Sequence, residues 1–182
     1  MHDNDRLWAP WRLAYITGDA TPDPDDPPRG ACFLCHYLAA PVERDRARLI
    51  VERGPLTVSI LNRYPYNNGH VLVAPKAHKA DLADLTPDEL LACQTALIRL
   101  TTALKSAFQA QGFNIGLNLG SVAGAGLPGH LHWHIVPRWA GDANFMPVTA
   151  GIRVLPQSLE TSCSLLADML RHMDANGPED RS

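Results

Sequence analysis

The sequence lacks three features that would place it in other classes of protein. No run of residues approaches the roughly 18 consecutive apolar residues of a membrane span. The first six residues lack the charged-then-apolar pattern of a secretory signal. Positive charge is not in excess, because 16 Lys and Arg face 19 Asp and Glu, which gives a net charge of −3. We therefore expect a cytoplasmic protein that binds no membrane, and the charge disfavours a nucleic acid partner.

The composition favours one globular domain with short flanking segments. The chain has 182 residues, of which 46% are hydrophobic, and this is ordinary for a soluble domain of that size. We expect an aromatic arm and a Pro-rich linker over residues 1–31, a single catalytic domain over 32–173 and a disordered tail over 174–182.

The order of helix and strand signals is typical of an α+β fold. A capping box at Thr86, with Pro87 in the first turn, predicts a long helix that ends near Gly112, and a second amphipathic helix is predicted over 158–172. A shorter helix is expected over 32–39. Strand-like runs occur at 48–52, 56–61, 71–74, 113–119 and 131–136. These signals predict an antiparallel sheet of about five strands with two main helices.

Three histidines alternate in the segment HLHWHIVP at residues 130–137. Side chains in a strand alternate between faces, so His130, His132 and His134 are expected on one face. At about 3.3 Å per residue, the first and the third lie roughly 13 Å apart, which suits two neighbouring sites better than one metal ion. A row of nucleophilic imidazoles, a catalytic zinc site and a solvated strand face are the competing interpretations.

A glycine-rich loop precedes these histidines at residues 120–129. Glycines allow backbone N–H groups to approach an anion, so this loop is either a phosphate cradle or a mobile turn.

The pair Cys32 and Cys35 has the C-x-x-C spacing of half a zinc site, whose other ligands must come from elsewhere. Buried thiols without metal are one alternative. A c-type haem attachment that includes His36 is another, and it would require export. Cys93 and Cys163 are interpreted as small core residues.

These motifs, in this order, resemble those of the histidine triad family of nucleotide hydrolases and transferases. The matching segments are GHVLVAPKAH at residues 69–78 and HLHWH at 130–134, and the resemblance covers about residues 32–140. The segments LNRYP at 61–65 and PRWAGDANFMP at 137–147 look like the bacterial branch near the diadenosine polyphosphate hydrolases and phosphorylases.

The resemblance implies a nucleotidyl transfer reaction. Dinucleoside polyphosphates would be cleaved at the α-phosphate through a covalent nucleotidyl-histidine, with His132 as the nucleophile, His134 on the phosphate and His70 as support. It also implies nucleotide contacts from Asn62, at the ribose position, and from Asn118, Gly124 and Gly126. Many members carry a Gly-Gln pair in the loop, and this chain has no glutamine there, which leaves the handling of the leaving group open.

The resemblance further implies a structural zinc, no organic cofactor and a homodimer in which the two sheets join. The implied zinc ligands are Cys32, Cys35, His78 and His130. Three other functions stay open: a phosphate-dependent phosphorylase, a phosphoramidate hydrolase and a nucleotide-binding adaptor without catalysis. An RNA-binding role for the tryptophans is also open, although core packing is the simpler interpretation.

Overall fold

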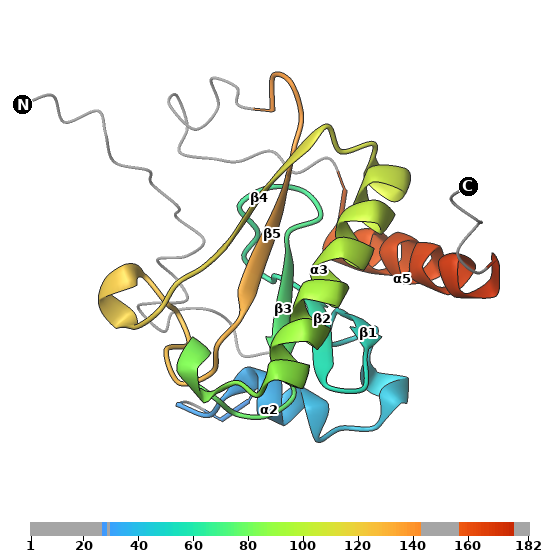
Figure 1. Ribbon diagram of the computed structural model, residues 1–182. Helices are drawn as coiled ribbons and strands as arrows, with labels where there is room; N and C mark the ends of the chain where they lie inside the picture. The colour runs from blue at the N-terminus through green and yellow to red at the C-terminus, as the bar shows by residue number, and fades with distance from the viewer. Residues whose placement is uncertain (1–26, 29, 143–156, 177–182) are drawn as a thin grey trace, which may run out of the picture.

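The computed structural model describes residues 27–28, 30–142 and 157–176. The predicted aromatic arm and most of the linker fall outside this part of the chain, as do residues 143–156 and 177–182. The described residues form a five-stranded antiparallel sheet and three α-helices (Figure 1). The α+β class and the antiparallel sheet predicted from the sequence are confirmed.

The sheet has the strand order β1-β2-β3-β5-β4. Its strands are β1 (Ile50–Arg53), β2 (Thr57–Leu61), β3 (Val71–Pro75), β4 (Gly112–Leu117) and β5 (Trp133–Arg138). All residues of β2 and β3 are buried, which agrees with the apolar runs in their sequences. The register pairs Ile60 with Leu72 and Leu72 with His134, so these three side chains lie in one row on one face of the sheet.

Two long helices cover the other face. Helix α3 (Pro87–Phe108) lies across the sheet and α5 (Leu159–Asn176) lies beside it (Figure 1). The predicted capping box is present, because the Thr86 hydroxyl accepts from the Glu89 N–H and the Glu89 carboxylate accepts from the Thr86 N–H. Lys79 adds an ion pair to Glu89 at 2.6 Å, which fastens the start of α3 to the loop after β3.

Three boundaries differ from the predictions. β5 begins at Trp133, so of the three alternating histidines only His134 belongs to the strand, while His130 and His132 lie in the segment that leads into it. Helix α3 ends at Phe108 because Gln109 takes a left-handed conformation with φ 53°. Helix α5 continues to Asn176, into the segment predicted as a tail.

The tryptophans of β5 and its C-terminal extension have packing roles. Trp133 is buried in the core, and the indole N–H of Trp139 donates to the Phe108 carbonyl at 3.1 Å. These contacts confirm the packing interpretation for both residues. Among the described helices, none is long and apolar enough to cross a membrane.

Candidate functional site

A cavity of about 370 Å³ lies on the face of the sheet opposite the two long helices. The row formed by Ile60, Leu72 and His134 lines it, together with His132. Aromatic and apolar side chains from α2 (Phe33–Leu38) and the start of β1 complete one wall, and these are Phe33, Tyr37 and Leu49. The cavity therefore has an apolar end and an imidazole end, which is typical of a small-molecule site.

A hydrogen bond to the backbone fixes the His132 ring so that the lone pair on Nε2 is available. Its Nδ1 lies 2.9 Å from the His130 carbonyl oxygen, and a carbonyl can only accept, so Nδ1 carries the proton. The other nitrogen, Nε2, then carries the lone pair of the neutral ring. Burial lowers the pKa of His132, so the ring stays neutral at pH 7. A neutral imidazole with a fixed tautomer is suited to nucleophilic attack.

His70 and His134 form a pair whose protons are also fixed. The Tyr66 N–H and the Asn62 amide both donate to Nδ1 of His70, at 3.1 and 3.3 Å, so this nitrogen is unprotonated. The proton of the neutral ring is then on Nε2, which lies 3.0 Å from Nδ1 of His134. Because Nδ1 of His134 accepts this hydrogen bond, the N–H of the neutral His134 ring is on Nε2. His134 is thereby a hydrogen-bond donor for a ligand in the cavity.

Tyr66 is a site residue that the sequence analysis missed. Its ring stacks on His70 with centroids 4.8 Å apart and lies 6.0 Å from the ring of His134. Tyr66 lies between the two segments that carry the family resemblance, 61–65 and 69–78, and belongs to neither. The available signal was an aromatic residue four positions before a buried histidine, and that signal says nothing about which way the backbone N–H points.

The predicted nucleotide contacts have different positions relative to the cavity. Asn62, Gly124 and Gly126 line it, and so does Leu127 from the glycine-rich loop. Asn62 also has internal contacts, because its Oδ1 accepts from the Tyr64 N–H at 2.9 Å. Asn118 follows β4 and is not among the residues that line this cavity, so its contact with a ligand stays a prediction.

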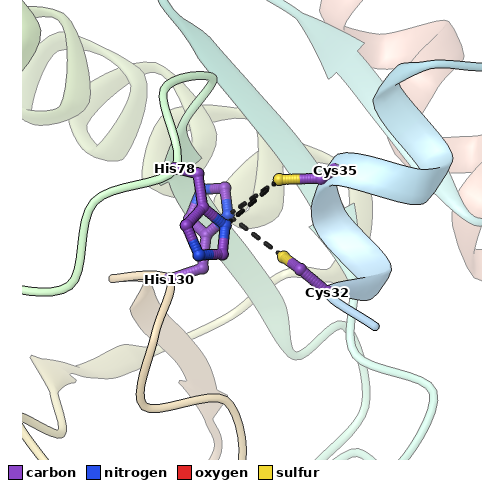
Figure 2. Close-up of side chains that lie close together, drawn as sticks. All are labelled: Cys32, Cys35, His78 and His130. Carbon is purple, nitrogen blue, oxygen red and sulfur yellow. Dashed lines mark hydrogen bonds between the residues drawn. The ribbon is translucent and has the colours of Figure 1, made fainter. Parts of the chain in front are cut away.

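A second cluster joins three segments that are distant in the sequence. Cys32 and Cys35 come from the start of α2, His78 from the loop after β3 and His130 from the segment before β5 (Figure 2). The four potential ligand atoms all lie within 4.8 Å of one another. Figure 2 shows both sulfur atoms directed at the two imidazole rings.

The distances in this cluster fit a tetrahedral ion. Cys32 Sγ lies 3.2 Å from His130 Nδ1, and Cys35 Sγ lies 3.3 Å from His78 Nδ1 and 3.5 Å from His130 Nδ1. With zinc bond lengths of about 2.3 Å to sulfur and 2.0–2.1 Å to nitrogen, a tetrahedron separates S and N by about 3.6 Å. Two sulfurs and two imidazoles are also a ligand set that zinc prefers.

His130 is preset as a ligand by its neighbours. Its Nε2–H donates to the Pro75 carbonyl at 2.9 Å, which leaves the Nδ1 lone pair directed at the sulfurs. Burial lowers the pKa of His130, so the ring is neutral, as metal binding requires. Burial and the neighbouring Cys32 raise the pKa of Cys35 to about 11 before any ion is present.

His130 also connects the two sites. Its side chain belongs to the four-residue cluster, and its backbone carbonyl fixes the tautomer of His132. The three alternating histidines therefore belong to two sites. The first, His130, is part of the cluster, and the second and third, His132 and His134, line the cavity.

The site places His132, with its Nε2 lone pair available, beside the donor His134 on an antiparallel sheet. The chain belongs to the HIT family, because the model of the HIT domain matches residues 44–141. A relative from Mycobacterium tuberculosis, named AP-4-A phosphorylase, is 42% identical over 165 residues, which are 89% of this chain and 82% of the relative. The asymmetrical bis(5'-nucleosyl)-tetraphosphatase of Schizosaccharomyces pombe is 38% identical over 90 residues, about half of each chain.

The solved structures agree with this assignment. A zinc-bound histidine triad family protein from Mycobacterium smegmatis superposes with a TM-score of 0.65 and 29% identity, over 81% of this chain and 98% of that one. A histidine triad nucleotide-binding protein from Sulfolobus tokodaii, at 24% identity and the same TM-score, shares the fold.

Proposed function

We propose that this protein cleaves dinucleoside polyphosphates by transferring a nucleotidyl group to His132. The observation that carries the proposal is the hydrogen bond from Nδ1 of His132 to the His130 carbonyl, which directs the proton away from Nε2. The names of the two enzyme relatives support the substrate class, since one is an AP-4-A phosphorylase and the other a bis(5'-nucleosyl)-tetraphosphatase.

The first step forms a bond between Nε2 of His132 and the α-phosphorus. The bond from that phosphorus to the bridging oxygen breaks, and the remaining polyphosphate leaves with its electron pair. For diadenosine tetraphosphate the leaving group is ATP, and the enzyme keeps an adenylyl-histidine. The Nε2–H of His134 is placed to donate to a phosphate oxygen, and Gly126 lines the same cavity, where its N–H adds a further donor. The Gly124 N–H already donates to the Ser121 carbonyl at 3.0 Å.

In the second step an acceptor displaces His132 from phosphorus. Water gives AMP, and inorganic phosphate gives ADP. The similarity to the AP-4-A phosphorylase, which covers 89% of this chain, favours inorganic phosphate over water as the acceptor. Phosphorylase chemistry is therefore the specific form of the reaction that we expect.

The decisive experiment supplies diadenosine tetraphosphate with and without inorganic phosphate, followed by chromatography of the nucleotides. ADP and ATP that appear only with phosphate support a phosphorylase. AMP and ATP in both samples support a hydrolase. No turnover in either sample would overturn the dinucleotide proposal and leave phosphoramidate hydrolysis or pure binding.

The four-residue cluster is proposed to hold one structural zinc ion. Cys32, Cys35, His78 and His130 fill a tetrahedral coordination sphere, so no position is open for substrate. The ion would tie α2 to the loop after β3 and to the segment before β5. The zinc-bound relative from Mycobacterium smegmatis supports the choice of metal.

A homodimer is proposed on the basis of the exposed edge of the sheet. β4 is an edge strand with largely exposed residues, and Ile115 on it is 48% exposed. Leu119 and Val122 continue this apolar surface, and Val122 is fully exposed. An edge strand with exposed apolar side chains is suited to pairing with a second copy of the same strand.

A further inference from the structure

The loop between β2 and β3 carries the groups that fix the histidine pair, and it is anchored from outside the cavity. Asn67 follows Tyr66 directly, and its side-chain amide donates to the Pro137 carbonyl at 3.1 Å and to the Asp142 carboxylate at 2.9 Å. A side-chain amide has two N–H groups, so both donors of Asn67 are used. The loop is thereby fastened to the end of β5 at the residue next to the one that contacts His70.

Asp142 is itself held in place by an ion pair. Arg138 donates through Nε and Nη2 to the two carboxylate oxygens, at 2.6 and 2.9 Å, and the Trp139 N–H donates at 3.2 Å. The carboxylate of Asp142 is 11% exposed. The hydrogen bond from Arg138 lowers the pKa of Asp142 to about 2, so the carboxylate is charged at neutral pH. A fixed, ionised acceptor is a stronger anchor for an amide than a mobile neutral one.

A second anchor acts on the neighbouring residue. Asn68 is buried, and its side chain is within 3.4 Å of Ser162 in α5 and of Gln157 just before it. These two contacts are longer than those of Asn67, so they are the weaker anchor. Asp142 therefore controls the position of the loop more directly than α5 does.

We propose that Asp142 is a positioning residue for the nucleotidyl transfer proposed above, acting through Asn67 and the Tyr66 N–H to keep the proton of His134 on Nε2. If the Tyr66 N–H moves off Nδ1 of His70, only the longer contact from the Asn62 amide, at 3.3 Å, still donates to that nitrogen. The form of His70 that is protonated on Nδ1, with Nε2 as an acceptor, then becomes more populated. His134 then donates from Nδ1, and its Nε2 presents a lone pair to the phosphate. The Nε2–H of His134, which would donate to the phosphate in the transition state, is then replaced by a lone pair that repels the phosphate oxygen.

The test compares three variants with the wild-type protein. Asn67→Ala removes the anchor, Asp142→Ala removes its acceptor, and Asp142→Asn keeps one acceptor oxygen while weakening the ion pair. Asp168→Asn is the matched control, because Asp168 is an exposed carboxylate that pairs with Arg171 on α5, away from the cavity. Asn67→Ala and Asp142→Ala are expected to lower kcat about tenfold to a hundredfold with little change in KM. Asp142→Asn should recover part of the loss, and Asp168→Asn should match the wild type.

A spectroscopic measurement separates this inference from the proposed reaction. Two-bond ¹H–¹⁵N correlation spectra of the imidazoles report which nitrogen of each ring is protonated, and a His70→Asn variant assigns the His70 signals. We expect His70 and His134 to be protonated on Nε2 in the wild type. In Asn67→Ala and Asp142→Ala, the Nδ1-protonated forms should become populated.

The tautomer measurement tests the role of Asp142, whereas turnover of the dinucleotide tests the proposed reaction. Tautomers that shift in both alanine variants support the inference even if no dinucleotide is turned over. Tautomers identical to the wild type in both variants overturn it, whether kcat falls or not. Because two different residues are replaced, failure of one variant to fold leaves the other as a test.

Discussion

Single atoms of the histidines decide what this site can do. Nδ1 of His132 and Nε2 of His130 each donate to a backbone carbonyl, whereas Nδ1 of His70 accepts from a backbone N–H. The sequence motif predicts that these histidines are important. It cannot predict their tautomers, because the partners are main-chain atoms of His130, Pro75 and Tyr66 whose directions depend on the folded backbone.

Replacement of His132 by Asn or Gly should abolish turnover while leaving nucleotide binding largely intact. The nucleophile is lost, whereas the apolar part of the cavity is unchanged, so kcat should fall by about 1,000-fold or more. Turnover of diadenosine tetraphosphate and calorimetric titration with a nucleotide measure the two effects. His172→Asn, on the exposed surface of α5, is the control. Wild-type turnover in the His132 variants would disprove the assignment.

Gly69→Ala should lower the free energy of unfolding by about 2 kcal/mol or more. Gly69 has φ +67°, and an added Cβ would lie 3.2 Å from Leu104 Cδ2, so both backbone strain and a close contact are expected. Gly124→Ala is the control, because Gly124 has a left-handed conformation with φ +87° but open space around its Cβ position. Urea denaturation measures both variants, and equal losses would show that the contact with α3 is unimportant.

At the scale of elements, α2 depends on its surroundings. It has six residues, which is far too short for a helix to be stable alone. Arg53 donates to the Leu38 and Ala40 carbonyls and so satisfies its C-terminal end. The cysteines at its N-terminal end face His78 and His130. The metal cluster is therefore expected to hold α2 on the sheet together with its buried residues Leu34 and Tyr37.

A Cys32→Ser, Cys35→Ser variant should lose its zinc and unfold at a lower temperature. Elemental analysis should give about one zinc per chain for the wild type and almost none for the variant. A loss of about 3 kcal/mol would lower the midpoint by about 10 °C in a domain of this size. Cys93→Ala, in the core of α3, should retain the metal. A variant without zinc that unfolds at the wild-type temperature would exclude a structural role.

Zinc binding to the metal-free protein should release protons at pH 7. The pKa of Cys35 is raised to about 11, so its thiol is protonated in the metal-free form, and only the thiolate binds zinc. At least one proton per zinc is expected, and zinc affinity should increase as the pH rises. A pH indicator in weakly buffered solution measures the release. Zinc uptake without proton release would contradict coordination by this thiol.

At the scale of the whole molecule, the sequence predicts the architecture well and the connections between distant segments poorly. The C-terminal end of strand β3 is predicted within one residue and the start of helix α3 at its capping box, because apolar runs and capping boxes are local signals. The zinc ligand set came from the family resemblance, since nothing local connects Cys32 with His78. The contact between Asn67 and Asp142 was not predicted, because it joins residues 75 positions apart without any motif.

The intact protein should have twice the mass of the 19.9 kDa chain in light scattering at micromolar concentration. Ile115→Lys should reduce it to the mass of one chain, because a charge would be placed on the exposed β4 surface. Leu56→Lys is the control, since Leu56 is 40% exposed but lies in the connection between β1 and β2, at the other side of the sheet from β4. A wild-type protein of single-chain mass would refute the homodimer.

The contact that orients His132, the proposed nucleophile, has a consequence for how such proteins can diverge. His132 is oriented by the main chain of His130, and main-chain atoms are the same in every amino acid. A related sequence can therefore have another side chain at position 130, and bind no metal, while it keeps the hydrogen bond to His132. The condition is that packing holds the segment in place. Loss of the cysteine pair therefore does not by itself remove the hydrogen bond that fixes the tautomer of His132.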